Sequence, residues 1–199
     1  VRVTGLAGHA GTVPMGSRRD ALAAAAEMLL FVEQHCEAHP GLVGTVGKIA
    51  AMPGAINVIP QDVEFTVDVR SGEDATRGAA VAAFVAGFEA IARRRGVRVA
   101  AAPFYMFDAA QCDTRLQALL AEAIVGHGLA VRRLPSGAGH DAMVFPAVAP
   151  MGMLFVRCGN RGISHHPDET LSAEDAEIGT SVLLHFFEHF DARAFADGR

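Results

Sequence analysis

The order of strand-like and helix-like segments in the first half of this chain constrains its fold more than any other feature. Two long helix-like segments, Arg18–Ala38 and Asp74–Arg95, end at Pro40–Gly41 and at Gly96, where proline and glycine stop helices. The strand-like segments around them are Val1–Leu6, Leu42–Ala51, Val63–Val69 and Val97–Phe107. The order strand, helix, strand, strand, helix, strand predicts a ferredoxin-like β-α-β-β-α-β fold, with both helices on one face of an antiparallel sheet.

The pattern changes after about residue 107. We expect two further helices and two strands, in the order helix Thr114–His127, strand Ala130–Leu134, strand Met151–Arg157 and helix Ala173–His189. Such alternation is typical of a parallel α/β sheet, but a sheet usually has about four to six strands. We therefore predict two domains, with residues 1–107 ferredoxin-like and residues 108–199 forming the C-terminal part of an α/β domain.

Composition and charge exclude several classes of protein. Hydrophobic residues make up 51% of the 199 residues, which is enough for a packed core. The net charge of −5 gives no basic surface for nucleic acid, and no apolar run is long enough to cross a membrane. Three widely spaced cysteines without a CxxC pair favour the cytoplasm. Because the chain begins with Val1 inside a strand-like alternation, we expect it to be trimmed or to be a piece of a longer gene product.

The first candidate for chemistry is His9, in the stretch GHAGTVPMGSRRDA. Its neighbours are glycine, alanine and threonine, which are too small to bury an imidazole, so the ring is expected to face a cleft. The alternative is a turn histidine that faces water.

Asn57 and Arg70 are the next candidates. Arg70 ends a cleanly alternating strand, VDVRS, so its guanidinium lies at a sheet margin where it can grip a carboxylate through two hydrogen bonds. An ordinary surface arginine is the alternative. Asn57, in PGAINVIP, can equally be a turn former between two prolines.

Two loops of the second half contain histidines. In PSGAGHDA, small residues precede His140, and Gly139 lets backbone N–H groups approach a ligand; the alternative is a tight turn capped by Asp141. In GISHHPDE, His165 and His166 are adjacent, so at most one of them is expected to bind a given metal ion.

Two histidine pairs spaced four apart, one at His35 and His39 and one at His185 and His189, can chelate a metal from one helix face. Neither forms an HExxH motif. We interpret both as surface histidines at helix ends, where positive charge suits the helix dipole.

Taken together, five motifs resemble those of the M20-type metal-dependent amidohydrolases: GHAGTVPMGSRRDA, PGAINVIP, FTVDVR, PSGAGHDA and GISHHPDE. They occur in the order found in that family and are most similar to the branch that contains N-carbamoyl-L-amino acid hydrolase and allantoate amidohydrolase. The resemblance covers essentially the whole chain.

The resemblance implies a catalytic α/β domain with two zinc or manganese ions, interrupted by a ferredoxin-like lid that forms a homodimer. It implies that His9 reaches into the partner subunit's active site and stabilises the oxyanion. By the same resemblance Asn57 and Arg70 hold the substrate carboxylate, and Gly139 and His140 belong to the active-site loop. His165 corresponds to a metal ligand.

The chain departs from the family in lacking most metal ligands and the glutamate base, which family members supply before the lid. One histidine cannot hold a two-metal centre, because catalytic zinc needs about three protein ligands. We therefore expect a metal-dependent C–N hydrolase of N-carbamoyl amino acids or allantoate, of which this chain alone is an inactive part. The alternatives are a non-catalytic dimerisation or binding module and a fragment of an M20-type peptidase.

Overall fold

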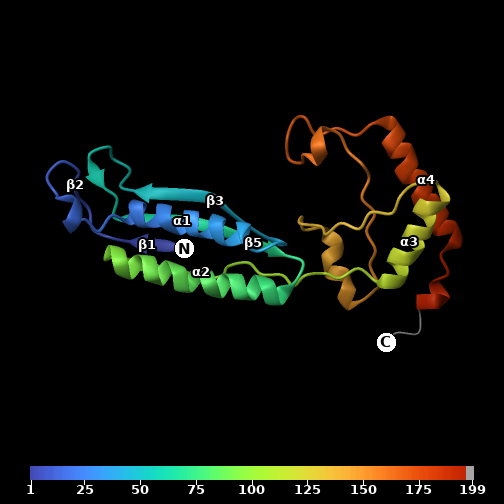
Figure 1. Cartoon of the computed structure of the whole chain (residues 1–199), viewed down its shortest axis with the longest axis horizontal. Helices are drawn as coiled ribbons and strands as arrows, with labels where there is room; N and C mark the ends of the chain where they lie inside the picture. The colour runs from blue at the N-terminus through green and yellow to red at the C-terminus, as the bar shows by residue number, and fades with distance from the viewer. Residues whose placement is uncertain (196–199) are drawn as a thin grey trace. The chain divides into compact units, whose positions relative to one another are not determined.

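The computed structural model describes residues 1–195, which form two compact units (Figure 1). Unit 1 is Val1–Ala109, and unit 2 begins at Ala110. Together they make a mixed α/β structure, as the sequence predicts.

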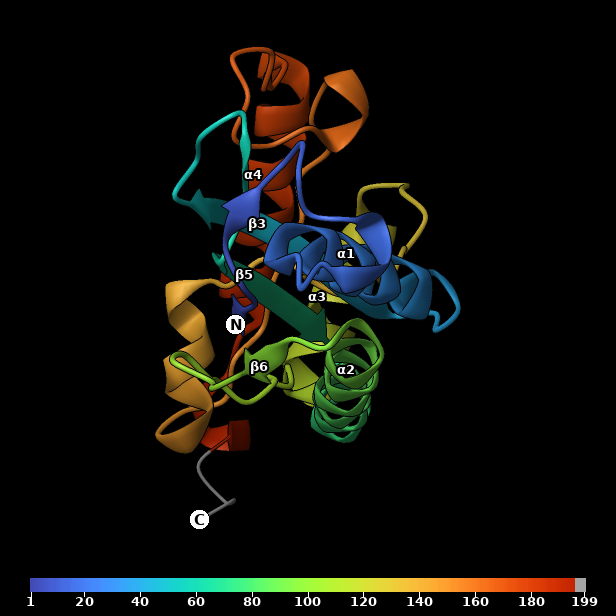
Figure 2. The same cartoon turned by 90° about the vertical axis from the view of Figure 1, so that its left-hand side faces the viewer.

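Unit 1 is built on a four-stranded sheet with the order β3-β5-β1-β6. Its strands are β1 (Arg2–Thr4), β3 (Leu42–Met52), β5 (Asp62–Ser71) and β6 (Arg98–Ala100). All neighbouring strands are antiparallel. The helices α1 (Ala21–Glu37) and α2 (Asp74–Arg95) lie on the same side of the sheet (Figure 2). Two further strands, β2 (Gly8–His9) and β4 (Val58–Ile59), pair separately.

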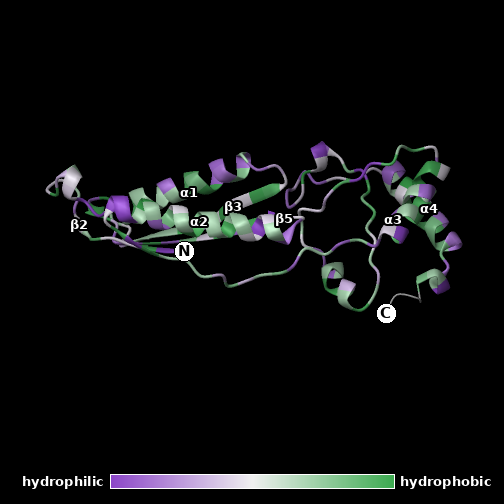
Figure 3. Ribbon diagram, turned by 60° about the horizontal axis from the view of Figure 1, so that its bottom comes forward, coloured by the Kyte–Doolittle hydropathy of each residue, from purple (hydrophilic) through white to green (hydrophobic). Residues whose placement is uncertain are grey.

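The core of unit 1 lies between these two helices and the sheet. Met28 of α1, Phe88 of α2 and Val63 of β5 are all at most 2% exposed. The rings of Phe88 and Phe65 pack edge to face, with centroids 5.8 Å apart. Gly87 lets the helices approach closely, because a Cβ there would overlap the ring of Phe31. Apolar residues run along both helices (Figure 3).

The helix α2 is the one described helix that is long and apolar enough to cross a membrane. Its buried residues, among them Phe84, Phe88 and Ile91, belong to the core of unit 1. Since 28% of the apolar stretch is buried, packing accounts for part of its apolar character.

Unit 2 contains the helices α3 (Thr114–Gly126) and α4 (Ala173–His189), which pack against each other, and the short 3-10 helices η2 (Asp141–Ala147), η3 (Asn160–Gly162) and η4 (Ala192–Phe195). The predicted strands Ala130–Leu134 and Met151–Arg157 are wrong, since neither segment is a strand in the described part of unit 2. A strand needs a neighbour to bond with, and the described residues of unit 2 offer none.

The apolar segment 151–157 packs instead against both helices of unit 2. A Cβ on Gly152 would lie 3.2 Å from Leu116 Cβ, and a Cβ on Gly179 would lie 2.8 Å from Val156 Cγ2. The apolar residues of segment 151–157 therefore pack on α3 and α4 and do not form a strand.

Two predicted boundaries in unit 1 also need correction. The first helix begins at Ala21 instead of Arg18, because Asp20 caps it and accepts hydrogen bonds from Leu22 N–H and Ala23 N–H, both at 3.0 Å. The last strand ends at Ala100 instead of Phe107. Pro103 has no N–H group to donate to a ladder.

Candidate functional site

His9 lies in the short ladder at one end of unit 1. The strands β2 and β4 pair antiparallel, which places His9 opposite Val58. Ala10 N–H donates to the carbonyl oxygen of Asn57 at 2.9 Å, which extends the pairing by one step. Two predicted site residues from distant parts of the sequence, His9 and Asn57, are thus brought together, and both are exposed.

The His9 ring is oriented by the backbone of its own loop. Gly11 N–H donates to His9 Nδ1 at 3.0 Å. A neutral imidazole whose Nδ1 accepts a hydrogen bond holds its proton on Nε2. The exposed Nε2–H group of His9 can therefore donate a hydrogen bond to a ligand.

Arg18 fixes the turn that follows His9. Its Nη2 donates to the carbonyl oxygen of Ala10 at 2.5 Å, and its Nε donates to that of Val13 at 3.1 Å. The carbonyl oxygen of His9 accepts from Thr12 N–H and Val13 N–H, both at 3.2 Å. The guanidinium therefore ties the two ends of the turn together.

Arg70 forms a close ion pair with Asp68, two residues earlier on β5. Arg70 Nε donates to Asp68 Oδ1 at 3.0 Å, and Arg70 Nη2 donates to Asp68 Oδ2 at 2.7 Å. This hydrogen bonding lowers the pKa of the Asp68 carboxyl and raises the pKa of Arg70. Both side chains are about half exposed.

Arg70 and His9 lie at opposite ends of unit 1. At one end of β5, Asp62 pairs with Thr4 and follows closely after the β2–β4 ladder. Arg70 pairs with Val43 at the other end. Arg70 is eight positions after Asp62, which corresponds to about 27 Å along an extended strand.

The Arg70 end of unit 1 is also where the chain leaves it. Ala109 N–H donates to Asp74 Oδ1 at 3.0 Å, and Asp108 lies 3.6 Å from Arg77. Asp74 begins α2 only three residues after β5 ends.

In unit 2, His140 caps a short helix. Its Nδ1 accepts a hydrogen bond from Ala142 N–H at 3.0 Å, and η2 begins at the next residue, Asp141. His140, rather than Asp141, is therefore the cap, and its Nε2 holds the proton of the neutral ring. Gly139 precedes it in the same exposed loop.

His165 lies in a loop that is closed at its base. Gly159 N–H donates to the carbonyl oxygen of Thr170 at 2.8 Å, and a Cβ on Gly159 would overlap the Thr170 hydroxyl. His165 has a φ of 57°, and its N–H donates to Glu169 Oε2 at 3.0 Å. A non-glycine residue in this left-handed conformation is uncommon and concentrates at functional sites.

The described residues do not complete a metal centre. In residues 1–195, no three His, Cys, Asp or Glu side chains are grouped so that they can hold an ion. Each helical histidine pair stacks with ring centroids 4.3 Å apart. Burial and the neighbouring His39 lower the pKa of His35.

Three side chains that position the candidates were not predicted from the sequence: Arg18, Asp68 and Glu169. The spacing of Asp68 and Arg70 contains a usable signal, because residues two apart in a strand lie on the same face. Arg18 was assigned to a helix, and no local pattern marks its contacts with Ala10 and Val13.

Comparison with known proteins agrees with the motifs. The chain matches peptidase family M20/M25/M40 over residues 7–189. It is 40% identical to the N-carbamoyl-L-amino-acid amidohydrolase of Pseudomonas sp. (strain NS671), over 92% of this chain and 44% of that protein. It is 37% identical to a probable allantoate deiminase of Oryza sativa subsp. japonica, over 94% of this chain and 44% of that protein.

A solved structure shares the fold. The crystal structure of an amidase of the hydantoinase/carbamoylase family from Burkholderia multivorans superposes with a TM-score of 0.87 at 38% identity, covering 93% of this chain and 45% of that one. The chain thus spans less than half the length of these relatives. The resemblance predicted from the motifs is confirmed, and the chain belongs to peptidase family M20/M25/M40.

Proposed function

We propose that the protein containing this chain hydrolyses a linear C–N bond in an N-carbamoyl-L-amino acid or in allantoate. The observation that supports this most directly is the His9 ring, held by Gly11 N–H with its Nε2–H group exposed beside Asn57. Such a donor suits the oxyanion that develops when a carbonyl carbon is attacked. The named relatives act in the same chemical class.

Each candidate has a role in this proposal. His9 stabilises the developing oxyanion. Arg70, kept in place by Asp68, binds the substrate carboxylate, and Asn57 adds a neutral hydrogen-bonding group. Gly139 and His140 line the substrate loop of unit 2.

The distance between the two groups of candidates argues for a shared active site. His9 and Asn57 lie at one end of the sheet and Arg70 at the other, about 27 Å away along β5. One substrate of amino-acid size cannot reach both ends of one chain. In a two-fold symmetric dimer, the His9 end of one unit 1 can meet the Arg70 end of its partner.

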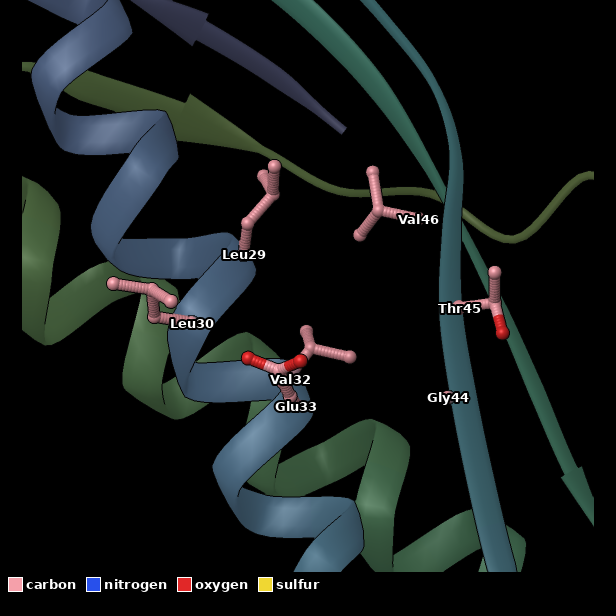
Figure 4. Close-up of a pocket in the computed structure, with 7 residues that line it drawn as sticks. All are labelled: Leu29, Leu30, Val32, Glu33, Gly44, Thr45 and Val46. Atoms are coloured by element: carbon pink, nitrogen blue, oxygen red, sulfur yellow. The ribbon is translucent and has the colours of Figure 1, made fainter.

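The edge strand β3 offers a surface for this dimer. It is 11 residues long and ends the sheet, so its outer side has no strand partner among the described residues. A cleft of about 370 Å³ separates it from α1, lined by Leu29, Leu30, Val32, Glu33, Gly44, Thr45 and Val46 (Figure 4). Leu30 and Val43 nearby are 54% and 56% exposed. An open edge of this kind favours pairing with a second copy.

The metal chemistry that the family resemblance implies does not fit this chain alone. His165 is its single candidate ligand, and no group of three ligands exists in residues 1–195. We therefore assign to this chain substrate binding and oxyanion stabilisation, and we expect the isolated 199 residues to be inactive.

Kinetics of a full-length enzyme that contains this segment test the assignments. His9→Ala is expected to lower kcat by about a hundredfold or more, because the oxyanion forms only as the reaction proceeds. Arg70→Ala is expected mainly to raise KM, because Arg70 contacts the carboxylate before and during reaction. Arg132→Ala, an exposed arginine of unit 2, is the matched control and leaves both constants unchanged.

Mixing inactive subunits tests the shared site. A heterodimer of His9→Ala and His165→Ala subunits contains one site with an intact metal ligand and an intact His9, so part of the activity returns. If heterodimers form and no activity returns, His9 does not act across the interface. Assays with dipeptides and with N-carbamoyl amino acids separate peptidase from amidohydrolase activity.

A non-catalytic dimerisation or binding module is the second candidate, favoured by the missing metal ligands in residues 1–195. It predicts that the chain forms dimers and binds a carboxylate ligand. It also predicts that His9→Ala in the full-length protein changes no hydrolytic activity.

A further inference from the structure

A groove in unit 1, which shares only Arg18 with the candidate site, is lined by five arginines. Its volume is about 570 Å³. One wall is the segment 15–20 before α1, and the other is the C-terminal end of α2. The arginines are Arg18, Arg19, Arg93, Arg94 and Arg95, out of 17 Lys and Arg residues in a chain whose net charge is −5.

The carboxylates of the protein neutralise only some of these guanidinium groups. Arg94 and Arg95 share one acceptor, Glu27. Arg93 lies 3.8 Å from Glu89, a weak and exposed pair. The remaining acid of the groove is Asp20, whose charge acts on Arg95.

Two of the arginines have unused hydrogen-bond donors. Arg19 is exposed, and its side chain makes no hydrogen bond or ion pair within the described residues. Arg95 Nε is buried and has no hydrogen-bond partner within residues 1–195. A buried donor without a partner is costly, but this Nε is closed to solvent, so a ligand in the groove would contact the exposed guanidinium of Arg19 instead.

The helix dipole explains this arrangement in part. Arg93, Arg94 and Arg95 lie in the last turn of α2, where positive charge is favourable. Arg18 and Arg19 lie before the N-terminus of α1, where the dipole favours negative charge, so the dipole does not account for them. The first N–H groups of α1 are already occupied by Asp20, so the guanidinium groups would provide the binding.

We propose that this groove binds a small soluble anion with two or more phosphate groups. Planar guanidinium groups match phosphate oxygens through paired hydrogen bonds, and several of them on two walls suit a ligand with several charges. The volume is that of a small-molecule site. The net negative charge of the chain opposes long nucleic acids and anionic membranes, which touch a wide surface.

The ligand would lie close to the His9 turn. Arg18 lines the groove and also holds the carbonyl oxygens of Ala10 and Val13. A ligand in the groove would therefore lie beside the arginine that holds the turn after His9. The binding itself does not depend on the hydrolase proposal.

Calorimetric titration of the 199-residue chain with inorganic pyrophosphate and tripolyphosphate at low salt tests the proposal. We expect both to bind, tripolyphosphate more tightly, with affinities that fall as salt is added. Arg19→Glu and Arg93→Glu, alone or together, are expected to weaken binding by about tenfold or more, because each removes and reverses a charge at the site. Both side chains are exposed, so the fold is retained, which circular dichroism checks.

The control is Arg132→Glu, which makes the same charge change on an exposed arginine of unit 2. It is expected to leave pyrophosphate affinity unchanged. Absence of pyrophosphate binding by the unmodified chain, or an equal loss in Arg132→Glu, overturns the proposal. Binding to vesicles that contain phosphatidylinositol bisphosphate, without binding to free pyrophosphate, also overturns the proposal of a soluble ligand.

Discussion

The two units of this chain each contain two α-helices but differ in what these helices pack against. In unit 1, α1 and α2 pack on four hydrogen-bonded strands, and their buried side chains form one continuous core. In unit 2, α3 and α4 pack on each other and on extended segments without ladders. The buried apolar residues described there are Leu116, Leu120, Ala123 and Val182.

The units differ in their buried apolar side chains and not in their exposed ones, since Leu30 and Val43 of unit 1 are 54% and 56% exposed. In unit 2, Phe155 is 52% exposed, Leu184 58% and Phe187 66%. A helix pair alone has too little surface to cover the apolar face of each helix, whereas a sheet supplies a broad one. Unit 1 is therefore expected to be the more stable part of the chain.

Hydrogen exchange should give the largest contrast between the units. Amides of the β3–β5 ladder are expected to exchange about a thousandfold or more slowly than those of residues 130–134, because opening the ladder requires opening the core of unit 1. Exchange measured residue by residue by NMR checks this. Similar protection in both places would show that unit 2 contains a cooperative core of its own.

A pair of phenylalanine substitutions sharpens the comparison. Phe88→Ala is expected to lower the free energy of unfolding by about 3–5 kcal/mol, because the ring is 2% exposed and packs against other core rings. Phe187→Ala removes the same side chain where it is 66% exposed, and about 0.5 kcal/mol or less is expected. Urea unfolding of both variants gives the two values, and equal losses would contradict the assignment of the core to unit 1.

The sequence predicted what depends on local signals. The helices α1 and α2 have long runs of helix-forming residues, and glycine or proline follows each of them. In unit 1, β3 and β5 are close in sequence, whereas β1 pairs with β5 and β6, which come much later in the chain. That distant pairing was predictable because the order of the segments matches the ferredoxin-like fold. The segments 130–134 and 151–157 also have strand-like composition, but their state depends on partner strands that composition does not reveal.

The candidate site shows the same limit. The motifs identified His9, Asn57 and Arg70 but not their arrangement. The short β2–β4 ladder brings His9 and Asn57 together, and the pairing of β3 with β5 places Arg70 at the other end of the sheet. Arg18 contacts the carbonyl oxygens of Ala10 and Val13, and such contacts leave no mark on sequence periodicity. The motifs show which residues are candidates, whereas the distances between these residues depend on how the strands pair.

The smallest expected effect is a loss of stability of α3 in acid, because the N-cap of this helix is the titratable Asp113. Asp113 Oδ1 accepts from Arg115 N–H at 2.8 Å, and Arg115 Nη2 donates to Asp113 Oδ2 at 2.8 Å. The hydrogen bond from the Arg115 side chain, with the backbone hydrogen bonds, lowers the pKa of Asp113 to about 2. Because the folded state lowers this pKa, the cap stabilises α3 at pH values above the unfolded pKa, which is near 4. The stabilisation is lost as the pH falls toward about 2.

We expect NMR signals of α3 to show partial unfolding over this pH range. Asp113→Asn, which keeps a cap without a titratable group, should remove this pH dependence, and an unchanged profile in that variant would assign the acid sensitivity to another group.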